Sequence, residues 1–120
     1  MTLHSFKDLD AWQQGHKVTL AIYKASKSFP HTEQFGLTNQ MRRAAISITS
    51  NIAEGFGRQT GKDKAHFYTI AKGSLLEVQS QLQVAFDLEY TDKKTYGAID
   101  SMIIQALQVT HGLIRSASTR

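Results

Sequence analysis

Apolar residues recur at three- and four-residue steps in four long segments of the chain, and no segment shows sustained two-residue alternation. A three-to-four step is the period of an α-helix with one buried face, whereas a half-buried strand would alternate at every second residue. Only one of the 120 residues, Pro30, is a proline, and proline breaks helix interiors. The sequence therefore predicts an all-α fold built from long helices.

The four helices are predicted at about residues 8–28, 38–54, 62–88 and 92–116, with a frayed polar tail over 116–120. Only short connections separate them, and helices joined in this way pack antiparallel to their neighbours. A length of 120 residues suits a single domain, residues 1–120. We therefore predict one antiparallel up-down four-helix bundle.

A glycine-rich stretch connects the second and third predicted helices. Gly55 and Gly57 suit the left-handed turn that often follows a helix. Glycines also build phosphate-binding loops, but the spacing from Gly55 to Gly61 does not match that motif. Asp63 also stands where the motif needs a serine or threonine for magnesium. We interpret the stretch as an interhelical turn.

Two of the predicted helices carry more apolar surface than one core requires. The core stripe of the first is predicted to be Leu9, Trp12, His16, Leu20 and Tyr23. Val18 and Ile22 lie roughly opposite this stripe, and Ile46 lies outside the stripe of the second helix. A second apolar face suggests a partner, often another copy of the chain. The alternative is one wide stripe covered by lysine stems; we favour self-association through Val18, Ile22 and Ile46.

The positive charge is concentrated in one segment. The chain has 14 basic and 10 acidic residues, and the whole excess lies between residues 42 and 72. Such a patch attracts phosphate groups or an acidic protein, and the alternative is a solvated surface with a chance imbalance. The residues predicted to contact nucleic acid are Arg42, Arg43, Arg58, Lys62 and Lys64.

No catalytic or metal-binding pattern stands out. The absence of cysteine excludes disulfides and thiolate metal sites. The five histidines never pair at ligand spacing, and Asp63-Lys64-Ala65-His66, the nearest match to a di-iron bundle motif, stands alone. No nucleophile elbow occurs. We predict no enzymatic activity, no metal and no cofactor.

The chain shows no membrane or export signal. No apolar run approaches the ~20 residues that a membrane span needs. The first residues lack the apolar region of a signal peptide. We therefore expect a cytoplasmic protein without a membrane partner.

Several ordered motifs resemble a known bacterial family. The motifs are Phe29-Pro30, Gly36-Leu37, Arg42-Arg43-Ala44, Asn51-Ile52-Ala53-Glu54-Gly55, Gly73-Ser74-Leu75 and Glu77. They look like the four-helix-bundle family first found encoded in intervening sequences of 23S ribosomal RNA genes. The resemblance extends over nearly the whole chain.

This resemblance implies a fold and a set of partners. Members of the family tend to form ring-shaped homopentamers. The family is also similar to the accessory variability protein of diversity-generating retroelements, a basic ring that binds a reverse transcriptase and nucleic acid. The signature positions fall here on Arg42, Arg43, Asn51, Glu54, Arg58 and Glu77. We interpret Asn51, Glu54 and Glu77 as structural or interface residues.

Two functional hypotheses follow. The first is a non-catalytic homo-oligomer that binds RNA or DNA through a basic surface on the second and third helices. The alternative is a protein–protein adaptor or scaffold that binds no nucleic acid. The surroundings of Arg43 and Arg58 distinguish them, because arginines buried against acids of a neighbouring copy would be unavailable to phosphate.

Overall fold

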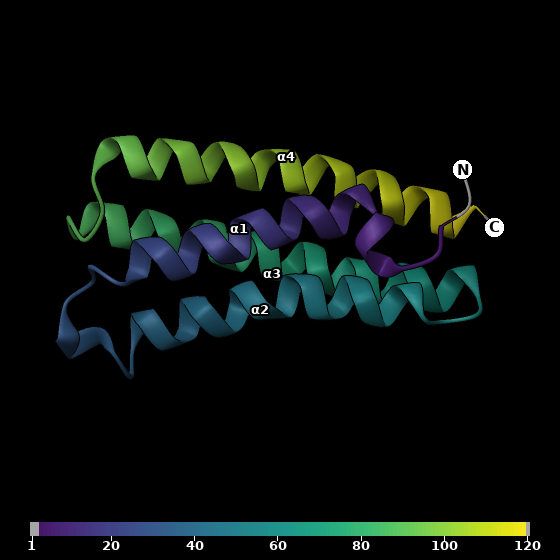
Figure 1. Ribbon diagram of the computed structural model, residues 1–120, viewed down its shortest axis with the longest axis horizontal. Helices are drawn as coiled ribbons and strands as arrows, with labels where there is room; N and C mark the ends of the chain where they lie inside the picture. Colours follow the sequence, from purple (N-terminus) through teal and green to yellow (C-terminus); the bar gives the residue numbers. More distant parts are fainter. Residues whose placement is uncertain (1–2, 120) are drawn as a thin grey trace.

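The computed structural model describes residues 3–119 and contains four long helices joined by short connections (Figure 1). The helices are α1 (Asp10–Ser26), α2 (Leu37–Phe56), α3 (Gly61–Asp87) and α4 (Lys93–Ser118). Two short 3-10 helices, η1 (Phe6–Asp8) and η2 (His31–Glu33), precede α1 and α2. No strand occurs in residues 3–119. Successive helices run in opposite directions, so the predicted antiparallel four-helix bundle is confirmed.

The bundle is elongated, with extents of 45 × 25 × 21 Å. Figure 1 shows the turn between α2 and α3 at the same end as the first and last parts of the chain. We call this the α2–α3 end, and it contains residues 57–60. The connections α1–α2 and α3–α4 lie at the opposite end, which we call the α3–α4 end and which contains residues 88–92.

One core runs along the bundle and receives side chains from all four helices. Its largest fully buried members are Ile22, Met41, Ile48, Ile52, Leu75, Leu82 and Ile103. Most apolar residues that recur at three- and four-residue steps in α2, α3 and α4 therefore face this core. Ile70 of α3 is exposed, whereas Tyr68 of the same helix is buried.

The core face predicted for the first helix was wrong in its second half, since Leu20 and Tyr23 are exposed, whereas Leu9 is buried and Trp12 packs against the core. Val18 and Ile22, predicted as interface residues, are 0% and 1% exposed, whereas Leu20 of the predicted core stripe is 56% exposed. The reason is a close approach to α2: a Cβ added to Gly15 would lie 2.8 Å from Cγ2 of Ile48. Thr19 Oγ1 also donates a hydrogen bond to the carbonyl of Ala45 at 2.8 Å. Small residues therefore fix the rotation of α1, and Val18 and Ile22 belong to the core of a single chain.

The last helix is longer than predicted. The sequence predicted a frayed tail from residue 116, but α4 continues to Ser118. Ala117 is buried against the core, and this burial offsets the polar character of its neighbours. The final residue, Arg120, lies outside the described residues.

The turn between α2 and α3 does not use left-handed glycine. Gly57 caps α2 with φ −78°, and no glycine in residues 3–119 has a positive φ, so the expectation for Gly55 and Gly57 was wrong. Gly55 lies inside the last turn of α2, where an added Cβ would be 2.6 Å from Cε1 of Tyr68. Gly55 is therefore needed for the close approach of α2 and α3.

Replacing Gly55 by alanine should lower the free energy of unfolding by at least about 1 kcal/mol, because the new methyl group must displace the Tyr68 ring. Gly57→Ala is the matched control, since its Cβ would meet nothing closer than 3.6 Å and its backbone is already right-handed. Urea unfolding of the two variants measures the difference. Equal stability would contradict the close contact at Gly55.

Candidate functional site

The five basic residues predicted to contact nucleic acid lie in two groups. Arg42 and Arg43 lie in the first half of α2, whereas Arg58, Lys62 and Lys64 surround the α2–α3 turn. At 1.5 Å per helical residue, Arg43 and Arg58 are roughly 22 Å apart along the bundle. The predicted surface is therefore divided into two separate places.

Arg42 packs against α1. Its Nε donates to Ser26 Oγ at 2.8 Å, and its Nη2 donates to the carbonyl of Tyr23 at 3.4 Å. The guanidinium also lies over the Tyr23 ring, 4.9 Å from the ring centroid. Arg42 therefore ties α2 to α1 and is half-buried.

Lys64 is engaged by the end of α2. Its Nζ donates to the carbonyl of Phe56 at 2.7 Å and lies 3.5 Å from the carbonyl of Gly55. These carbonyls belong to the last turn of a helix, where no intrahelical donor is available and the helix dipole is negative. The positive charge of Lys64 therefore completes the C-terminus of α2.

Arg58 and Lys62 keep their charges at the surface. Arg58 Nη2 lies 3.3 Å from Glu54 Oε2, and the Arg58 side chain is 45% exposed. Its guanidinium lies over the ring of Phe67, 4.5 Å from the centroid. Lys62 is exposed in the first turn of α3. An exposed ion pair contributes only about 0–1 kcal/mol, so Glu54 does not withdraw Arg58 from other anions.

Arg43 lies in a shallow depression between α2 and α3. The depression has a volume of about 480 Å³ and is lined by Phe35, Asn39, Gln40, Arg43, Ala44 and Glu77. Arg43 and Glu77 bring opposite charges to it from facing helices of the same chain. Phe35 is 87% exposed at its edge.

Asn51 makes structural contacts at the seam between α2 and α3. Its Nδ2 donates to the carbonyl of Ser47 at 2.8 Å and to Ser47 Oγ at 3.0 Å. Ser47 Oγ in turn lies 2.8 Å from Ser74 Oγ on α3. Glu77, on the same side of α3, accepts a hydrogen bond from Gln81 at 3.3 Å. Whether Asn51, Glu54 and Glu77 also contact another copy of the chain stays a prediction.

The charge excess is a property of one end of the bundle. The half next to the α2–α3 turn comprises residues 3–17, 48–73 and 106–119, with seven basic and four acidic side chains. The other half comprises residues 18–47 and 74–105, with six basic and six acidic side chains. The positive charge therefore gathers at the α2–α3 end, where Arg58 and Lys62 lie.

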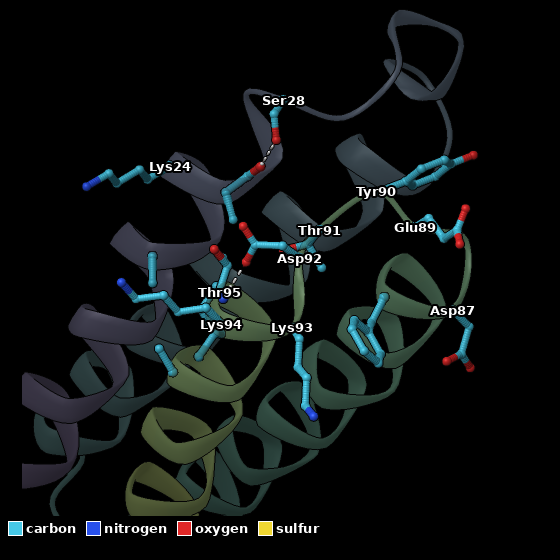
Figure 2. Close-up of a pocket in the computed structure, with 15 residues that line it drawn as sticks. Lys24, Ser28, Asp87, Glu89, Tyr90, Thr91, Asp92, Lys93, Lys94 and Thr95 are labelled. Carbon is cyan, nitrogen blue, oxygen red and sulfur yellow. Dashed lines mark hydrogen bonds between the residues drawn. The ribbon is translucent and has the colours of Figure 1, made fainter.

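The α3–α4 end carries a groove that the sequence did not reveal. It has a volume of about 1080 Å³ and lies between α1 and the start of α4 (Figure 2). Small side chains on the facing helices leave it open, namely Ala21, Ala25 and Ala98. Figure 2 shows Lys24 and Lys94 on one side and Asp87 and Glu89 on the other. Charges of both signs line the groove, and its polar side chains form no convergent cluster. We therefore assign no chemical class of ligand to it.

A single carboxylate organises the connections at this end. Glu33 Oε1 accepts the N–H of Leu37 at the start of α2, and Glu33 Oε2 accepts the Tyr90 hydroxyl at 2.9 Å. The hydrogen bond to Glu33 is the main cause that raises the pKa of Tyr90, and burial and the negative charge of Glu33 raise it further. The Tyr90 ring also packs 5.7 Å from that of Phe29. The α1–α2 and α3–α4 connections are thus held together.

Asp92 caps α4 beside the groove. Its Oδ1 accepts the N–H of Thr95 at 2.7 Å (Figure 2). This backbone hydrogen bond is the main cause that lowers the pKa of Asp92, with smaller contributions from the Thr95 side chain and the charge of Lys94. A carboxylate whose pKa is lowered by folding stabilises the fold only while it is ionised.

Asp92→Ala should lower the melting temperature at neutral pH, because α4 loses its cap. The difference from wild type should shrink as the pH falls below about 3.9 and through the lowered pKa of Asp92, where wild type loses the same carboxylate. Thr60→Ala removes the hydroxyl cap of α3 and should cost the same at every pH. Melting curves at several pH values test this, and a pH-independent loss for Asp92→Ala would contradict it.

The described helices show neither a metal cluster nor a membrane span. No group of three or more His, Asp or Glu side chains in residues 3–119 is placed to hold a metal ion. None of the helices in these residues is long and apolar enough to cross a membrane.

Comparison with known proteins identifies the family. A solved structure described as a protein with unknown function from the S23 ribosomal protein family of Bacteroides thetaiotaomicron has the same fold, with a TM-score of 0.80 and 20% identity. The alignment covers 88% of this chain and 95% of that one. No curated protein matches the chain significantly. The family model described as 23S rRNA-intervening sequence protein matches residues 7–112. This chain therefore belongs to the 23S rRNA-intervening sequence protein family.

Proposed function

We propose that this protein is a non-catalytic, homo-oligomeric four-helix bundle that binds RNA or another nucleic acid at its α2–α3 end. The observation that carries the proposal is the uneven charge, with seven basic and four acidic side chains in that half of the bundle. Local positive potential draws phosphates to a surface even when the net charge of the chain is modest. The opposite half is neutral and offers no such attraction.

The contacts around each basic residue narrow the site. Arg42 and Lys64 already donate to groups of their own chain, whereas Arg58 and Lys62 are more exposed than these two, and the acid that Arg58 contacts, Glu54, is itself exposed. Arg43 is exposed but shares the depression between α2 and α3 with Glu77, which brings a negative charge to it. We therefore assign the phosphate contacts to Arg58 and Lys62 first.

The homo-oligomeric part of the proposal rests on exposed apolar side chains of α1 and α2. Leu20 is 56% and Ile46 is 46% exposed, and Tyr23 of α1 is exposed as well. On α1 we assign the interface to Leu20 and Tyr23 in place of Val18 and Ile22, together with Ile46 of α2. Covering apolar surface contributes roughly 25 cal/mol per Å², which favours assembly. The homopentamer remains a prediction of the resemblance.

A second candidate function is the protein–protein adaptor. The observation that favours it is Phe35, which is 87% exposed beside Arg43 and Glu77. An exposed aromatic residue next to an arginine is typical of a protein interface. A reverse transcriptase, the protein partner that the resemblance implies, stays a prediction.

Salt should weaken nucleic-acid binding, and this salt dependence should arise from the cations at the α2–α3 end. We expect the log–log salt slope for a structured RNA to become less negative by about 1.4–1.8 in Arg58→Ala/Lys62→Ala, since each lost phosphate contact removes about 0.7–0.9. Lys24→Ala/Lys94→Ala removes the same charge from the other end and should leave the slope unchanged. Fluorescence anisotropy at several salt concentrations measures it. Wild-type affinity no higher than that of a neutral control protein would refute nucleic-acid binding.

Oligomerisation should depend on the exposed face of α1 and α2. Light scattering on a sizing column should give wild type a mass that is a multiple of 13.4 kDa. Leu20→Glu/Ile46→Glu should dissociate it without loss of helical circular dichroism, because both side chains point to solvent in the single chain. Val84→Glu/Leu88→Glu, at the end of α3 and just after it, is the control and should remain assembled. A wild-type monomer of 13.4 kDa would contradict self-association.

A further inference from the structure

Arg58 presents a planar cation at the α2–α3 end. Its guanidinium lies over the ring of Phe67, 4.5 Å from the ring centroid, and its Nη2 is 3.3 Å from Glu54 Oε2. Nearly half of the side chain nevertheless remains exposed. Arg58 therefore contacts an aromatic ring and a carboxylate of its own chain and still leaves part of its surface open to a ligand.

The support of Arg58 by an aromatic ring is more than phosphate binding requires. A phosphate needs only a mobile positive charge, which Lys62 supplies from the first turn of α3. A planar guanidinium held in one orientation can also stack on the face of a nucleobase. His66 adds an exposed ring beside the half-buried Phe67, with 5.3 Å between ring centroids. This end of the bundle therefore combines positive charge with flat π surfaces.

The location of these groups favours unpaired nucleotides over a duplex. The bases of a duplex are stacked on each other, so their faces are unavailable to a side chain. Arg58 and Lys62 also lie at a narrow tip, since the bundle measures only 25 × 21 Å across its length. A tip with few cations cannot follow the phosphates of a helical turn, but it can hold one or two flexible nucleotides.

We propose that the α2–α3 end binds single-stranded nucleic acid, with one base stacked on the Arg58 guanidinium in addition to the phosphate attraction of its charge, and the adjoining phosphate on Lys62. This inference rests on the proposed nucleic-acid function and names the form of the ligand. Glu54 and Phe67 act as positioning residues, because they orient Arg58 and do not contact the nucleotide.

Three labelled ligands separate stacking from charge. They are an unstructured single-stranded RNA of about 12 nucleotides, a strand of the same length without bases, and a duplex of that length. Full-length wild type should bind the single strand about 10-fold more tightly than the strand without bases, which is within the range of one stacked base. Anisotropy titration at fixed salt gives the three dissociation constants.

Arg58→Lys is the decisive variant because it keeps the positive charge and removes the planar guanidinium. It should lose about 10-fold in affinity for the single strand, to the level of the strand without bases. Its affinity for the other two ligands should change by no more than about twofold, since each retains the phosphate attraction. Lys62→Gln should weaken binding of all three ligands by a similar factor. Circular dichroism checks that both variants keep the wild-type helix content.

The outcomes distinguish the two proposals. If wild type binds the single strand and the strand without bases equally, the stacking inference is overturned while the nucleic-acid function stands. If Arg58→Lys keeps the preference for bases, Arg58 is not the platform and the inference is overturned as well. If none of the ligands binds to this protein more tightly than to a neutral control protein, the proposed function fails, and the stacking inference fails with it.

Discussion

The close approach of α2 and α3 determines the geometry on which the rest of the bundle depends. It is possible because small residues meet at the seam, where Ser47 Oγ lies 2.8 Å from Ser74 Oγ and Gly55 touches the Tyr68 ring. With the helices this close, the turn between them needs only residues 57–60. Lys64 then reaches back to the carbonyl of Phe56, and Arg58 reaches the ring of Phe67. The charged tip is therefore a consequence of the seam.

Much of the fold could be predicted from the sequence, because helix period and helix punctuation are local properties. The four predicted helices differ from the observed ones by no more than about two residues at each end, within the usual uncertainty of helix boundaries. The face of α1 could not be predicted in this way. The periodicity places Leu20 and Tyr23 on the predicted core face. The rotation of α1 about its axis is instead determined by the contacts of Gly15 and Thr19 with α2. Such contacts join residues far apart in the chain.

The candidate site was only partly predictable for the same reason. Neighbouring residues of a helix point about 100° apart, so Arg42 and Arg43 could not share one surface. Arg42 donates a hydrogen bond to Ser26 on another helix, and no local sequence pattern predicts this contact. The charge excess was visible in the sequence, but its gathering at one end depends on how the helices are stacked. The groove lined by Ala21, Ala25 and Ala98 could not be predicted, because an alanine is compatible with both a buried and an exposed position.

The uneven charge of a body 45 Å long also has a consequence for how it meets a partner. A neutral half and a positive half form a permanent electric dipole along the bundle axis. In the field of a polyanion such a dipole experiences a torque that turns the α2–α3 end forward before any atoms touch. If copies assemble with their axes parallel, these dipoles add, and the assembly acquires one positive face. Orientation during approach would then be set by long-range electrostatics, and the short-range contacts would only have to recognise what has already been aligned.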